Sequence, residues 1–65
     1  MTAIDRIRKE YDTASAKKQE LTERLRQTEK ADPDNFYEIW LIRDQIAYWE
    51  GKSEGLKFAL DLLGG

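Results

Sequence analysis

Apolar residues recur at alternating steps of three and four along both halves of the chain. The repeated positions in the first half are Ile4, Ile7, Tyr11, Ala14, Lys18, Leu21, Leu25 and Thr28. Those in the second half are Ile39, Ile42, Ile46, Trp49, Ser53, Leu56, Leu60 and Leu63. Such spacing places one stripe on one side of an α-helix, and each stripe lasts four heptads. The pattern predicts two helices and an all-α fold class.

A capping box marks the start of the first helix. Thr2 and Asp5 stand three residues apart, so the hydroxyl and the carboxylate can satisfy each other's free backbone N–H groups. The first helix is therefore expected over about residues 3–30. Pro33 disfavours helical backbone at the residue before it, which makes residues 31–32 the expected turn.

An Asp-Pro pair marks the expected start of the second helix. Asp32 is expected to be its N-cap and Pro33 its first residue, because proline presets φ and needs no partner for an N–H. The helix is expected over about residues 33–63. Gly64 and Gly65 then suit a left-handed C-terminal cap.

The two stripes fit each other when the chain folds back at the turn. Positions whose numbers add to 63 or 64 then face each other, which sets Ala14 against Trp49 and Tyr11 against Ser53. Small residues thus face large ones, as interdigitated packing requires. Lys18 falls inside the seam and is expected to snorkel outward or to find a carboxylate. We predict an antiparallel two-helix hairpin.

The second helix is apolar on the side opposite the hairpin seam as well. One partner helix cannot cover both sides, and an exposed aromatic patch would invite aggregation. We therefore predict a homodimer, built as a twofold four-helix bundle with the second helices at its centre. The residues expected in the dimer interface are Phe36, Trp40, Ala47, Gly51, Gly55, Phe58, Ala59 and Leu62.

Four small residues, Ala47, Gly51, Gly55 and Ala59, follow one another at a constant spacing of four within this second face. A glycine inside a helix costs about 1 kcal/mol relative to alanine, so something must gain from the bare backbone. Close contact between helices is the preferred interpretation. A break of the second helix at residues 51–55 is the alternative.

The register of the dimer stays open at the level of sequence. An antiparallel pair with its axis near Trp49 brings Trp40 to Phe58 of the other copy. The same register brings Asp44 near Glu54, which counts against it because like charges repel. A parallel pair and a shift of one turn are the other possibilities.

The chain contains no cysteine and no histidine, and its net charge is −2. Disulfides, Cys/His zinc sites and the common nucleophile-base pairs are therefore excluded. We expect no enzyme activity, no cofactor and no metal site. The longest apolar run covers residues 39–42, far less than the roughly 20 residues that cross a bilayer. A soluble, cytoplasmic protein of one domain over residues 1–65 is expected.

Charge is distributed unequally between the two halves. Residues 1–31 hold eight Lys/Arg and six acids, which gives +2, whereas residues 32–65 hold three and seven, which gives −4. Arg6, Lys17 and Arg24 project along one flank of the first helix and are candidate contacts for phosphates. The layout resembles that of the Rop family of plasmid RNA-binding proteins, whose short hairpins dimerise into four-helix bundles. A solvated charged face is the alternative interpretation.

Taken together, these patterns favour a non-enzymatic homodimeric module, a scaffold, adaptor or small regulator that acts through protein-protein contacts. Phe36, Tyr37 and Trp40 cluster near the turn and form the candidate docking point for another protein. One alternative is a Rop-like regulator that binds RNA or DNA through the first helix. The other is a subunit of a larger heteromeric complex.

Overall fold

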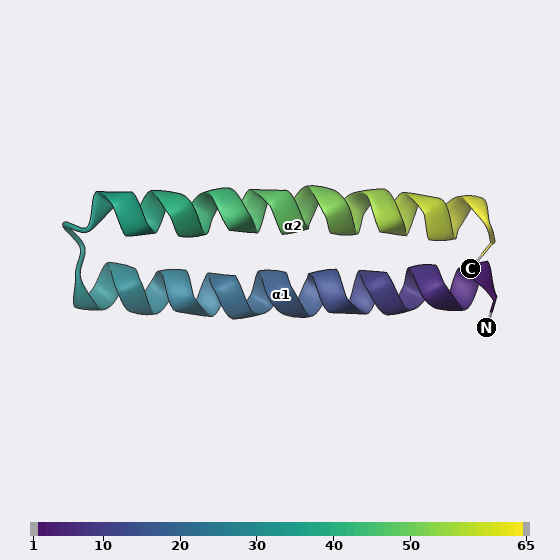
Figure 1. Ribbon diagram of the computed structural model, residues 1–65, viewed down its shortest axis with the longest axis horizontal. Helices are drawn as coiled ribbons and strands as arrows, with labels where there is room; N and C mark the ends of the chain where they lie inside the picture. The colour runs from purple at the N-terminus through teal and green to yellow at the C-terminus, as the bar shows by residue number, and fades with distance from the viewer. Residues whose placement is uncertain (1, 65) are drawn as a thin grey trace.

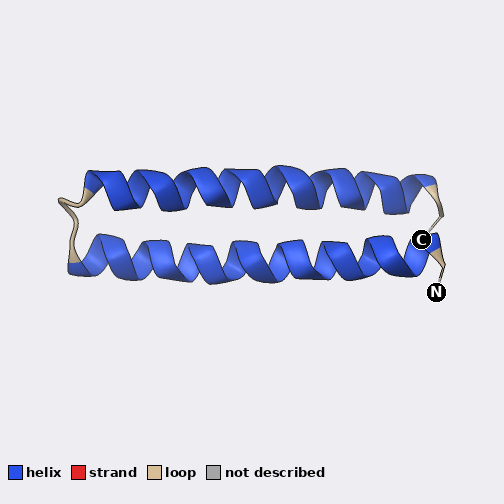
Figure 2. Cartoon of the chain, viewed as in Figure 1, coloured by secondary structure: helices blue, strands red, loops and turns tan. Residues whose placement is uncertain are grey.

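The structure is a computed structural model that describes residues 2–64. It contains two helices, α1 (Ala3–Ala31) and α2 (Phe36–Leu62), which run antiparallel and side by side along their whole length (Figures 1 and 2). The molecule measures 45 × 15 × 13 Å. The predicted all-α two-helix hairpin is confirmed.

The capping box at the start of α1 is present. The Thr2 hydroxyl accepts a hydrogen bond from the Asp5 backbone N–H at 3.1 Å. The Asp5 carboxylate accepts in return from the Thr2 backbone N–H at 3.4 Å. Two N–H groups that have no partner within the helix are thereby satisfied, as the sequence predicts.

The start of α2 differs from the prediction. Asp32 is the C-cap of α1, because its N–H still donates to the Thr28 carbonyl at 2.8 Å. The Asp32 carbonyl then accepts from the Asn35 N–H at 3.1 Å, which closes a turn with Pro33 at its second position. Asn35 is the N-cap, and its side chain accepts from the Glu38 N–H at 3.2 Å. The expected turn at residues 31–32 and the expected helix start at Pro33 were wrong, because the chain must reverse before a second helix can begin.

The predicted stripes form the contact between α1 and α2. Every predicted position of α1 is buried or half-buried, and so is every one of α2 except the exposed Leu63. Within residues 2–64 only Ala14 and Ile42 are fully buried, with 0% and 2% of their surface exposed. The core is narrow because each helix covers only one side of the other.

Ion pairs join the two helices on both sides of the seam. The ammonium group of Lys18 lies 3.8 Å from the Glu50 carboxylate, and 41% of the Lys18 side chain is exposed. The expectation that this lysine snorkels outward or finds a carboxylate is confirmed, since its side chain is partly exposed and its ammonium group pairs with Glu50. The other interhelical pairs are Arg24 with Glu38 at 3.2 Å and Arg43 with Glu29 at 3.4 Å. All of these groups are at least partly solvated, so each pair contributes at most about 1 kcal/mol.

Helix α2 continues without a break through Gly51 and Gly55. The Ser53 hydroxyl donates to the Glu50 carbonyl at 3.2 Å within the helix and caps no second piece. The alternative of a helix broken at residues 51–55 is therefore wrong, and the outer face of α2 is one uninterrupted surface.

The end of α2 has the left-handed cap that the sequence predicts. Leu63 is the C-cap, and its N–H donates to the Ala59 carbonyl at 3.1 Å. Gly64 follows with a φ of 77°, a backbone conformation that glycine adopts readily. The other predicted cap residue, Gly65, lies outside the described residues.

Candidate functional site

An exposed aromatic face runs along the side of α2 that points away from α1. Phe36, Trp40 and Phe58 have 74%, 63% and 65% of their surface exposed. Tyr37, Tyr48 and Leu62 are also exposed and widen the same face. Soluble monomers rarely expose a contiguous apolar patch of this kind.

The exposed area of the hairpin is large for its mass. The molecule exposes 5105 Å², whereas the relation for compact folded monomers gives about 4,300 Å² at this mass of 7.6 kDa. The excess of about 800 Å² equals the share that one partner contributes to a standard protein-protein interface. One layer of helices therefore leaves as much surface uncovered as one such interface would bury.

Two glycines leave bare backbone in the middle of this face. A Cβ atom placed on Gly51 or on Gly55 would find no atom within 4 Å outside the helix's own backbone. Neither residue has a positive φ, so an alanine would fit the backbone of both. Nothing within the hairpin requires glycine at either position.

The structure places the eight predicted interface residues on one helix. Seven of them, Phe36, Trp40, Ala47, Gly51, Gly55, Phe58 and Leu62, are exposed, and Ala59 is half-buried. Ala59 therefore lies at the edge of the exposed face, where α1 begins to cover α2. The predicted docking residues Phe36, Tyr37 and Trp40 are all exposed at the start of α2, beside the turn.

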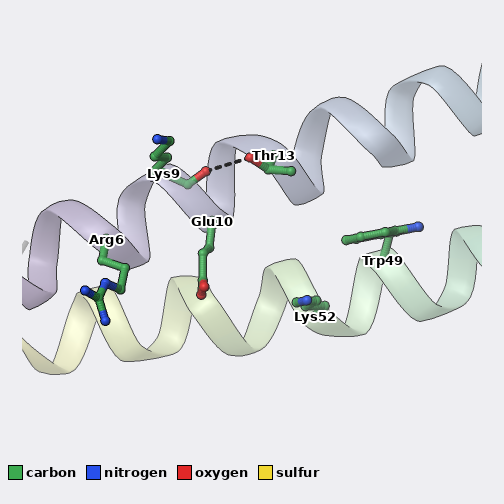
Figure 3. Close-up of a pocket in the computed structure, with 6 residues that line it drawn as sticks. All are labelled: Arg6, Lys9, Glu10, Thr13, Trp49 and Lys52. Carbon is green, nitrogen blue, oxygen red and sulfur yellow. Dashed lines mark hydrogen bonds between the residues drawn. The ribbon is translucent and has the colours of Figure 1, made fainter.

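The predicted nucleic-acid contacts lie along one flank of the groove between the helices. Arg6 lines a cleft of about 440 Å³ together with Trp49 and Lys52 (Figure 3). Lys17 and Arg24 line a second cleft of about 400 Å³, and Trp49 lines this one too. The structure therefore brings the three predicted basic residues to two clefts that meet at one indole ring.

Acidic side chains reduce the positive charge of this flank. Glu10 lines the first cleft and Glu20 lines the second. The guanidinium group of Arg24 is already paired with Glu38 at 3.2 Å. These carboxylates would weaken the attraction of the clefts for phosphate groups.

Of the six residues that line the first cleft, sequence reasoning named Arg6 as a site residue and missed the other five: Lys9, Glu10, Thr13, Trp49 and Lys52. The ammonium group of Lys52 lies 5.3 Å from the centroid of the Trp49 ring, within cation-π distance. The spacing of three between Arg6 and Lys9 was a signal within one helix. Trp49 and Lys52 come from the other helix, so their place in this cleft depends on the register of the hairpin.

Residues 2–64 contain no group of three or more metal-ligating side chains placed to hold an ion. In the same part of the chain, neither helix has the length and apolar character needed to cross a membrane. No protein-family model, no curated protein and no solved structure matches the chain.

Proposed function

We propose that this protein is a non-enzymatic interaction module that acts as a homodimer, with two copies joined through the outer faces of α2 into a four-helix bundle. The observation that carries the proposal is the exposed aromatic face of α2, on which Trp40 and Phe58 are 63% and 65% exposed. Burial of this face would supply the apolar contact that the narrow α1–α2 seam lacks.

A second copy of the chain fits this face because the face carries both bulky side chains and bare backbone, and each kind can pack against the other kind on the second copy. Bulky side chains stand towards its two ends, at Trp40 and Phe58, and the bare backbone of Gly51 stands near its middle. A twofold axis can set bulky groups of one copy against small groups of the other. The uncovered area of about 800 Å² also matches one partner's share of a standard dimer interface.

The proposed role is that of a scaffold, adaptor or small regulator in the cytoplasm, a compartment that suits a chain without cysteine. The candidate docking residues Phe36, Tyr37 and Trp40 lie at the start of α2 beside the turn, where a central dimer contact would cover them least completely. Aromatic side chains often anchor protein-protein interfaces, so this end is the proposed docking point for another protein.

Mass measurement tests the homodimer. By sedimentation velocity and light scattering, the parent chain is expected to have twice the chain mass of 7.6 kDa. Gly51→Leu places a large side chain on the bare backbone of the face and is expected to give a helical monomer. Ala16→Leu adds the same side chain at an exposed position of α1 and should remain a dimer.

A parent chain that is a stable helical monomer would overturn the homodimer. An isolated parent chain that aggregates or fails to fold would favour the heteromeric alternative, in which a different protein covers the face. Far-ultraviolet circular dichroism, recorded on the same samples, distinguishes the folded outcomes from the unfolded one.

A second candidate function is RNA or DNA binding on the basic flank, as in a Rop-like regulator. The observation that favours it is the meeting of two basic clefts at Trp49, an aromatic group of the kind that stacks on nucleotide bases.

A mobility-shift assay tests this second candidate. A triple Arg6→Ala, Lys17→Ala, Arg24→Ala variant would then lose a salt-dependent mobility shift. The matched control removes Arg8, Arg26 and Lys30 from the opposite side of α1 and should keep the shift. Absence of binding at low salt would remove this candidate.

A further inference from the structure

We propose that the two copies meet antiparallel in one register, in which positions of α2 whose numbers add to 99 face each other. This inference rests on the homodimer proposed above. Starting at Tyr37, steps of four and three alternate along the outer side of α2 until Leu62. The unbroken helix keeps these positions in phase, so α2 carries a second seam opposite the one that contacts α1.

The outer layers of the second seam are apolar in this register. Tyr37 faces Leu62 of the second copy, and Leu41 faces Phe58. Tyr37, Phe58 and Leu62 are exposed in the single hairpin, whereas Leu41 is half-buried. Each of these layers occurs twice in a twofold dimer, so the register covers large side chains at both ends of the interface.

The inner layers set larger residues against glycine. Tyr48, which is 60% exposed, faces Gly51 of the second copy, and Asp44 faces Gly55. Space for a large ring beside a bare backbone is what interdigitated packing requires. The register therefore gives both internal glycines a function that the hairpin alone does not give them.

Charge also favours the register in which paired numbers add to 99 over the adjacent register in which they add to 98. When the paired numbers add to 98, Asp44 lies opposite Glu54, and two carboxylates repel each other. When they add to 99, Asp44 lies opposite Gly55, about one helical turn from Lys52 of the second copy. Among residues 2–64, no carboxylate lies within 4.0 Å of the Lys52 ammonium group, whose recorded partners are the rings of Trp49 and Tyr48 at 5.3 and 6.0 Å, so a pair with Asp44 would displace no other ion pair.

A parallel pair would lose these complements, because each residue would face its own copy. The Asp44 carboxylates would face each other, and glycine would face glycine at positions 51 and 55. One layer would then hold two like charges, and two layers would hold no side chain at all. Size and charge both favour the antiparallel pair.

Disulfide trapping tests the register, because the natural chain contains no cysteine. The test variant is Asp44→Cys/Gly55→Cys, and the matched control is Leu41→Cys/Gly55→Cys, which keeps the same glycine substitution and moves the other thiol by about one helical turn. Within one helix the two cysteines of either variant lie at least about 10 Å apart, too far for an internal bond. After oxidation in a thiol redox buffer, non-reducing electrophoresis measures the covalent dimer.

The test variant is expected to form about tenfold more covalent dimer than the control, because a disulfide needs Cα atoms within roughly 7 Å. Equal or greater trapping of the control, or trapping of Asp44→Cys alone, would overturn this register and leave the homodimer standing. A parent chain that sediments as a monomer would instead overturn the homodimer itself.

A second pair guards against a variant that fails to fold. Leu41→Cys/Phe58→Cys reports the same register from an outer layer, and circular dichroism of each reduced variant checks its helix content against the parent. Absence of covalent dimer in both folded pairs, with a dimeric parent, would contradict the register.

Discussion

At the scale of single residues, short-range hydrogen bonds fix the ends of the helices. Thr2 and Asp5 complete their capping box within one turn, without any contribution from α2. Asn35 does the same for α2 through the Glu38 N–H. Such bonds act locally, so their loss should lower stability without changing the packing of the hairpin.

Replacement of Thr2 by alanine tests this view. Thr2→Ala removes the acceptor for the Asp5 N–H and should lower the free energy of unfolding by about 1 kcal/mol. Thr13→Ala is the matched control, because the Thr13 hydroxyl donates to the Lys9 carbonyl in the middle of α1. Alanine is favoured at such a position, so the control should be neutral or slightly stabilising. Urea titration followed by circular dichroism measures both changes, and an equal loss in the two variants would contradict the capping role.

Residue-scale prediction succeeded where the signal was local and failed where several signals competed. At the first helix start, Thr2 and Asp5 were the residues that matched a capping box. Around the turn, Asp32, Asp34 and Asn35 all have side chains that can cap a helix. Asn35 is the N-cap of α2, because the Asp32 N–H still donates to the Thr28 carbonyl at the end of α1.

At the scale of the helices, one narrow seam holds α1 and α2 together. Ala14 and Ile42 are its buried residues, and most other seam side chains are half-buried. Lys18 interrupts the apolar stripe and pairs with Glu50 at 3.8 Å on a solvated edge. The pair satisfies the lysine and leaves apolar area in the seam uncovered.

Replacement of Lys18 by leucine should therefore stabilise the hairpin. Lys18→Leu loses a solvated ion pair that contributes less than about 1 kcal/mol to stability. It gains part of the roughly 1.5–3 kcal/mol that full burial of a leucine side chain contributes. A net gain of about 1 kcal/mol in the free energy of unfolding is expected by urea titration at fixed chain concentration. Lys17→Leu, at an exposed neighbouring position, should give no such gain. A loss of stability in Lys18→Leu would show that the Glu50 pair dominates at this site.

At the scale of the whole molecule, the outer face of α2 is the feature that a single hairpin does not explain. Its aromatic side chains are exposed, and among residues 2–64 a Cβ added at Gly51 or Gly55 would meet no atom within 4 Å outside the backbone of α2. A dimer built on this face would make folding stability depend on chain concentration, since association adds free energy by mass action.

The melting temperature of the parent chain should rise by a few degrees for each tenfold rise in concentration, which stabilises a dimer by about 1.4 kcal/mol. Phe58→Ser removes an exposed aromatic group of the face and should weaken this dependence. Ala16→Ser, on the exposed side of α1, should retain it. A parent melting temperature that is independent of concentration would contradict the dimer.

The sequence by itself determined the two helices, their antiparallel seam and the first capping box. All three depend on residues close in the chain or on a repeated spacing, and both kinds of signal are visible in one dimension. The register predicted along with the seam, in which Ala14 faces Trp49, assumed a turn at residues 31–32, whereas the chain reverses at residues 32–35 and Lys18 pairs with Glu50 at 3.8 Å.

Only the tertiary structure decided where the chain reverses, whether α2 continues through its glycines and which side chains share a cleft. The reversal depends on which N–H groups α1 retains, and the glycines remain helical with Ser53 bonded to the Glu50 carbonyl. Arg6 and Trp49 line one cleft because the two helices lie in one particular register. The place of the turn depends on which hydrogen bonds the end of α1 keeps, and the clefts depend on how two helices pack that are distant in sequence. Neither can be read from the spacing of residues along the chain.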